Sequence, residues 1–132
     1  MIFVDTSVWI EALREASSPE GAHLASLLDA DEVTLAAPVR LEILAGASKA
    51  DRRRLRRTLD ALPVFFPTAA TWGLLDRWVD TAGDAHQRFG IADMLVAVLA
   101  AERGAPVWSN DRDFQRMERL GLVTTHRPPS TP

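Results

Sequence analysis

Four acidic side chains stand where a folded chain can bring them together, although they are far apart in the sequence: Asp5, Glu42, Asp93 and Asp111. Neighbouring carboxylates repel one another unless a cation joins them. Mg²⁺ and Mn²⁺ prefer oxygen ligands, usually a few carboxylates with water completing the shell. An ion held in this way can activate water and neutralise charge that builds up on a phosphodiester. The four residues therefore predict an acidic pocket for a divalent metal.

Short apolar segments that alternate with longer amphipathic ones must position these acids. Four segments predict strands, at residues 2–4, 33–36, 64–66 and 107–109. Helices are expected at residues 6–15, 22–28, 38–46, 49–62, 69–82, 91–103 and 112–120. This alternation predicts an α/β fold with helices on both faces of a mainly parallel sheet of four to five strands, residues 122–125 being the fifth.

The predicted strands place the acids at one edge of the sheet. Asp5 ends the first strand, Glu42 lies in the helix after the second, and Asp111 follows the fourth by two residues, while Asp93 opens a helix. Ligands of open α/β sheets bind outside the carboxyl ends of the strands. We therefore expect the four carboxylates to converge there.

Each acid also has a purely structural interpretation. Asp5, Asp93 and either Asp111 or the nearby Asp113 can cap helices. Glu42 can be favoured by the positive end of its helix dipole. Only the joint placement of the acids favours a functional site.

Composition excludes several other kinds of chemistry. The 132 residues include no cysteine, which rules out disulfides, thiolate zinc sites and a cysteine nucleophile. The three histidines show no metal-ligand spacing. Net charge is −3, but setting the four site acids aside leaves 14 of the 18 acidic residues against 15 basic ones. A nucleic-acid partner is therefore compatible with the charge.

The chain reads as a single domain over residues 1–126, followed by a flexible Pro-rich tail at residues 127–132. No apolar run is long enough to span a membrane, and the N-terminal residues have no signal-peptide layout. A cytoplasmic location is therefore expected.

Two other features have more than one interpretation. Residues 49–57 form the densest basic run, either a solvated helix face or a flank that contacts nucleic-acid phosphates, the solvated face being the simpler choice. Arg112 and Arg116, close to Asp111, are better placed to contact a nucleic acid beside the acidic pocket. Among the tryptophans, Trp72 is expected in the core, with an interface as the alternative.

Four segments of the chain carry the four acids in order: IFVDTSVWI at residues 2–10, PVRLEILAG at 38–46, IADMLVA at 91–97 and VWSNDRDF at 107–114. These segments resemble the motifs of PIN-domain ribonuclease toxins of the VapC type. Each motif is weak alone, whereas the ordered set spans nearly the whole chain and is fairly specific.

The resemblance implies a PIN-like three-layer α/β/α sandwich and a metal-dependent endoribonuclease, the toxin of a type II toxin–antitoxin pair. It implies Mg²⁺ or Mn²⁺, a homodimer, and a cognate VapB-like antitoxin that covers or enters the pocket. A metal-activated water would attack the RNA phosphodiester in line and leave 3′-hydroxyl and 5′-phosphate ends.

The resemblance also carries roles to individual residues. Asp5, Glu42 and Asp93 match the three acids of the family, and Asp111 matches the fourth, with Asp113 open as an alternative. Asp5, Asp93 and Asp111 are the expected metal ligands. Residues expected to hold the acids or orient the substrate are Thr6, Ser109, Asn110 and Asp113.

Two α/β classes fit the sequence less well. A phosphatase that forms an aspartyl phosphate needs a second aspartate two residues after the first, where this chain has Ser7. A receiver-like signalling domain needs a late lysine, and no lysine follows Lys49. The alternative that stays open is a PIN-fold module that binds RNA or protein with little or no turnover.

Overall fold

The computed structural model describes residues 1–129 and contains a four-stranded, all-parallel sheet. The strands are β1 (Ile2–Val4), β2 (Val33–Ala36), β3 (Val64–Phe65) and β4 (Val107–Trp108). Their order across the sheet is β3-β2-β1-β4, with Phe3 paired to both Thr34 and Val107. β1 and β2 are buried throughout, as expected for strands of a parallel sheet that is covered on both faces.

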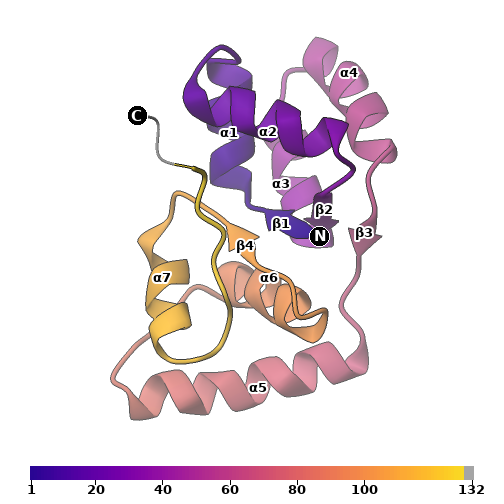
Figure 1. Cartoon of the computed structure of the whole chain (residues 1–132). Helices are drawn as coiled ribbons and strands as arrows, with labels where there is room; N and C mark the ends of the chain where they lie inside the picture. Colours follow the sequence, from indigo (N-terminus) through magenta and orange to yellow (C-terminus); the bar gives the residue numbers. More distant parts are fainter. Residues whose placement is uncertain (130–132) are drawn as a thin grey trace.

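Within residues 1–129, seven helices connect and follow the strands (Figure 1). They are α1 (Thr6–Arg14), α2 (Pro19–Asp29), α3 (Ala37–Gly46), α4 (Lys49–Asp60), α5 (Ala69–Asp84), α6 (Ile91–Glu102) and α7 (Arg112–Arg119). The predicted α/β/α sandwich is confirmed.

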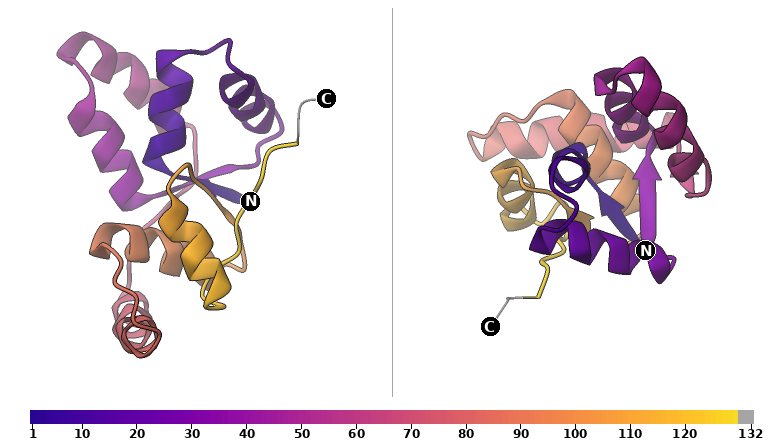
Figure 2. Two further views of the ribbon diagram at one scale, coloured as in Figure 1. Left: turned by 90° about the vertical axis from the view of Figure 1, so that its left-hand side faces the viewer. Right: turned by 90° about the horizontal axis from the view of Figure 1, so that it is seen from above.

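The strand order explains how the helices are distributed. The chain moves outward from β1 to β2 and β3, and then returns past β1 to β4. Because parallel crossovers are right-handed, reversing the direction of travel moves the connecting helices to the opposite face of the sheet. Figures 1 and 2 show α1 to α4 on one side of the sheet and α5 to α7 on the other. The switch point therefore lies between β1 and β4, where open α/β sheets bind ligands at the carboxyl ends of the strands.

Helix α6 is the central element of the second helical layer. Residues Met94 to Ala100 are all buried, and the helix packs against β1, β2 and β4. A helix that is apolar almost all round is held by packing on every side. Its first turn is consequently fixed relative to the sheet edge, and that turn carries Asp93.

Three local predictions were wrong. Helix α2 begins at Pro19 instead of residue 22, because Ser18 caps it and proline suits the first helical position. Residues 122–125 form no strand, since only Thr125 bridges to Val107. Trp72 is half exposed because it lies on the outer face of α5, whereas Trp78 on the same helix is buried.

The C-terminal segment returns across β4. His126 donates its backbone N–H to the carbonyl of Val107, and Arg127 pairs with Glu118 at 3.3 Å. The rest of the predicted flexible tail lies partly outside the described residues, which end at 129. Among the described helices, none has both the length and the apolar character needed to cross a bilayer.

Candidate active site

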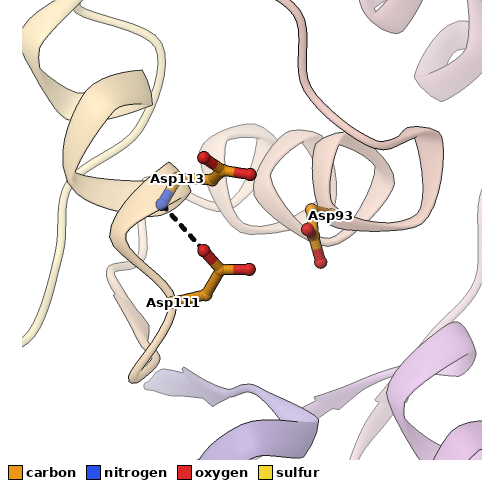
Figure 3. A group of neighbouring side chains, drawn as sticks. All are labelled: Asp93, Asp111 and Asp113. Carbon is orange, nitrogen blue, oxygen red and sulfur yellow. Dashed lines mark hydrogen bonds between the residues drawn. The ribbon is translucent and has the colours of Figure 1, made fainter.

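Three carboxyl groups from two helices meet at the switch point. Asp93, Asp111 and Asp113 each offer one oxygen, and these oxygens lie within 4.8 Å of one another. Figure 3 shows Asp93 at the start of α6 facing Asp111 and Asp113 at the start of α7. Both helices present their N-terminal turns to the cluster, and helix N-termini favour negative charge.

Asp111 and Asp113 also make hydrogen bonds within α7. Asp111 caps α7 by accepting the backbone N–H of Asp113 at 2.9 Å, and its other oxygen points toward Asp93 (Figure 3). Asp113 accepts a hydrogen bond from Arg116 at 2.7 Å. The structural and functional interpretations of Asp111 are therefore compatible, and the geometry places Asp113 beside it as an equal candidate.

The pKa of Asp93 shows that further acids act on the cluster. The pKa is raised from 3.8 to about 6, most of all by burial and then by the negative charges of Asp5, Asp111, Asp113 and Glu42, in that order. Each of these groups disfavours a second negative charge nearby. All four sequence-predicted acids thus belong to one electrostatic site, although Asp5 and Glu42 lie outside the close three-oxygen group found among the described residues.

Asp5 is held by hydroxyl groups. It occupies the N-cap position of α1 but makes no side-chain capping bond there. Its Oδ2 instead accepts hydrogen bonds from Ser109 at 2.8 Å and from Ser7 at 3.0 Å. The purely structural interpretation of Asp5 as a helix cap is therefore wrong for its side chain.

The two serines also fix the loop after β4. Ser7 Oγ accepts the backbone N–H of Asn110 at 3.1 Å, and Ser109 Oγ accepts that of Asp111 at 3.0 Å. Each hydroxyl thus joins Asp5 to the loop that carries Asp111. Ser7 was missed as a site residue because in sequence it is only the second residue of a helix.

The other residues that the sequence assigned to the site are Asn110, Thr6 and Glu42, and they differ in burial and in hydrogen bonding. Asn110 donates its side-chain amide to Glu20 at 3.2 Å. Thr6 is buried, and its hydroxyl has no hydrogen-bond partner within the described part of the chain. Glu42 is exposed on α3, where it lines a groove of about 480 Å³ between α1, α3 and α4. These contacts leave the roles of Thr6, Asn110 and Glu42 as predictions.

The fold and site define an α/β protein with a carboxylate cluster at the switch point of a parallel sheet. The PIN domain model matches residues 2–120, and the chain belongs to that family. It is 31% identical to ribonuclease VapC11 of Mycobacterium tuberculosis, over 91% of this chain and 93% of the relative. It is 36% identical to ribonuclease VapC18 of the same organism, over 91% of this chain and 90% of that relative. These relatives confirm the VapC-type resemblance.

A solved structure agrees with this assignment at the level of the fold. The VapBC2 complex of Rickettsia felis, bound to a promoter DNA fragment, contains a chain that superposes with a TM-score of 0.77. The two chains are 17% identical, with 96% of this chain and 98% of that chain covered. At this identity the likeness shows the fold alone.

Proposed function

We propose that this protein is a metal-dependent endoribonuclease that acts as the toxin of a type II toxin–antitoxin pair. The observation that carries the proposal is the convergence of Asp93, Asp111 and Asp113, with Asp5 and Glu42 close enough to raise the pKa of Asp93. Relatives named VapC ribonucleases, similar over 91% of the chain, support the same activity.

The donor set fits Mg²⁺ or Mn²⁺. Three carboxylate oxygens within 4.8 Å of one another suit a hard ion that keeps several water ligands. We assign metal binding to Asp5, Asp93 and Asp111, with Asp113 as the further candidate. When bound, the ion supplies activated water and neutralises charge on the phosphodiester.

The protein's own residues hold the carboxylates in place. Ser7 and Ser109 orient Asp5, and Ser109 also binds the backbone of Asp111. The N-terminal turns of α6 and α7 lower the cost of gathering negative charge. Arg112 and Arg116 remain our candidates for contacts to RNA beside the acids, although Arg116 also pairs with Asp113.

The proposal is tested by incubating purified protein with cellular RNA in the presence of Mg²⁺ or Mn²⁺, and then with EDTA. We expect cleavage with either metal, loss of cleavage with EDTA, and products with 5′-phosphate ends. Restoring the metal after chelation should restore activity, because the acids are positioned by the fold without the ion.

An Asp93→Asn preparation, purified in parallel, controls for a contaminating nuclease. Cleavage that persists in EDTA, or that is equal in this variant, would contradict the proposed site. RNA binding without cleavage under any metal would instead favour the binding-module alternative.

A VapB-like antitoxin is the partner we propose. The groove lined by Glu42 also has an apolar lining, in which Ile10 and Leu13 of α1 are 45% and 49% exposed. Arg14, Asp51 and Arg54 add charges along the same groove. A partner segment with one apolar face could fill it and reach the acidic site through Glu42. The solved VapBC2 complex, which has this fold, supports such a partner.

Replacing Leu13 with glutamate is expected to weaken binding of the cognate antitoxin by about tenfold to a hundredfold, since a buried leucine contributes roughly 1.5–3 kcal/mol. Titration calorimetry measures the change. The matched control is Ala25→Glu, at an exposed position of α2. Equal affinity of parent and Leu13→Glu protein would place the antitoxin elsewhere.

Three further assignments remain proposals. We propose a homodimer, supported by the exposed Trp72 and Val79, which are seven residues apart on one face of α5. We propose a single domain that ends near residue 126. We place the protein in the cytoplasm, where its RNA substrate is.

A further inference from the structure

We propose that the outer flank of α4 is a binding site for the phosphate backbone of RNA, separate from the acidic pocket. The site consists of Lys49, Arg53, Arg56 and Arg57, which with Arg52 and Asp60 line a surface groove of about 320 Å³. This inference rests on the proposed function, in which RNA is the substrate. The flank of α4 would supply part of the protein's affinity for that RNA.

The charge of the molecule is strongly divided. Helix α4 contains six basic and two acidic residues, a net charge of +4. The whole chain carries −3, which leaves −7 for everything outside this helix. A polyanion approaching the protein is therefore attracted to α4 and opposed over much of the remaining surface. The carboxylate cluster itself repels phosphates, so binding affinity must come from elsewhere.

Basic residues outnumber acidic ones in this groove, since five of its lining residues are basic and one, Asp60, is acidic. Asp60 pairs with Arg40 of α3 at 2.7 Å, and Asp51 pairs with Arg54 at 3.2 Å. In the described part of the chain, Lys49, Arg53, Arg56 and Arg57 make no ion pair. Their charges are consequently available to an external anion.

The spacing of the cations also disfavours an ordinary solvated face. Lys49 with Arg53, Arg52 with Arg56, and Arg53 with Arg57 are like charges four residues apart. Such pairs destabilise a helix, whereas opposite charges at this spacing stabilise it. A bound row of phosphates relieves the repulsion, and guanidinium groups bind phosphate through paired N–H donors.

The helix is well supported beneath this flank. Leu55 and Leu59 are buried against the core, and Ser48 caps the first turn. Arg52, which also lines the groove, donates to the carbonyls of Leu44 and Ala47 at the end of α3, and these bonds fix α4 to its neighbour. Figures 1 and 2 show α4 at the periphery of the molecule, away from α5 to α7. The flank is thus a rigid, accessible surface.

The test measures binding of a labelled single-stranded RNA by fluorescence anisotropy, in EDTA, across a salt titration. Arg53→Gln/Arg56→Gln is compared with the parent and with Arg77→Gln/Arg119→Gln, which removes the same charge from exposed positions on α5 and α7. Each lost phosphate contact on a single strand lowers the slope of log K against log salt by about 0.7. We expect a slope smaller by about 1.4 and affinity about tenfold lower at ~0.1 M salt for the α4 variant, with little change in the control.

Three results would overturn the inference: an unchanged slope and affinity in the α4 variant, an equal loss in the control, or weaker antitoxin binding with intact RNA binding. Circular dichroism and thermal melting confirm that both variants are folded. Because binding is measured without metal, it is separate from cleavage. A parent protein that binds RNA through α4 and never cleaves it would refute the nuclease and leave this site standing.

Discussion

Replacing Asp93 with asparagine is expected to lower the rate of RNA cleavage by about a hundredfold or more, and at the same time to stabilise the metal-free protein. The loss of activity follows from the position of Asp93, which faces Asp111 and Asp113 across the cluster. Changes to groups that merely support metal ligands cost about tenfold to a hundredfold. Removing a direct metal ligand is therefore expected to lower the rate by at least about a hundredfold.

The gain in stability follows from the raised pKa of Asp93. The unfolded chain ionises this group near its ordinary pKa of 3.8, and the folded protein ionises it at about 6. Between these pH values the folded state binds more protons, so the free energy of unfolding falls as pH rises. Once the pH exceeds the pKa of Asp93 in the folded protein, the free energy of unfolding falls no further on account of this group. At neutral pH the ionised carboxylate therefore destabilises the metal-free fold.

Asparagine removes that charge with little change in shape. The full shift corresponds to roughly 3 kcal/mol, and solvent screening of this half-buried group reduces the expected gain to about 1–2 kcal/mol at neutral pH. Near pH 4 parent and variant should have similar stability. Urea unfolding in EDTA at both pH values measures the difference, with Asp80→Asn, at an exposed position of α5, as the control.

Metal should reverse the order of stability. An ion present at a hundred times its dissociation constant stabilises the parent by about 2.7 kcal/mol, and it should do little for the variant. A variant that is inactive and also less stable in EDTA at neutral pH would indicate disrupted folding instead of a lost ligand. A variant that is stabilised by metal as strongly as the parent would remove Asp93 from the metal site.

The elements that place the acids were predictable from sequence, because β1 is a short, wholly apolar run and β2 is apolar apart from Thr34. A parallel sheet brings the carboxyl ends of its strands to one edge, which is why Asp5, after β1, and Asp111, after β4, could be assigned to the same site. The start of α2 was not predictable in this way, because Ser18 and Pro19 are equally typical of a loop and of a helix N-terminus.

Side-chain partners depend on three-dimensional neighbours that no local pattern contains. Ser7 and Ser109 are 102 residues apart, and their hydroxyl oxygens lie 3.2 Å from each other. Trp72 was assigned to the core on its residue type, although it lies on α5 with half of its surface exposed. The choice between Asp111 and Asp113 stayed open for a similar reason, because Asp111 is the N-cap of α7 and Asp113 lies in the first turn of the same helix.

The serine pair gives the second large expected effect. Ser109→Ala should lower the rate of RNA cleavage by about tenfold to a hundredfold, as do other changes to groups that orient metal ligands. The hydroxyl of Ser109 donates to Asp5 at 2.8 Å and accepts the backbone N–H of Asp111 at 3.0 Å. Alanine would free both acids from a shared anchor, so a higher metal concentration should be needed for half-maximal activity.

Two comparisons separate positioning from general damage to the fold. Ser109→Thr keeps the hydroxyl and should restore most of the activity and the metal requirement of the parent. Ser7→Ala removes the other hydroxyl that binds Asp5, so the double alanine variant should lose less than the product of the two single losses, because both serines act on one carboxylate. Ser109→Ala protein with normal metal dependence would mean that Asp5 is held adequately by β1 and Ser7, and that Ser109 acts only on the loop.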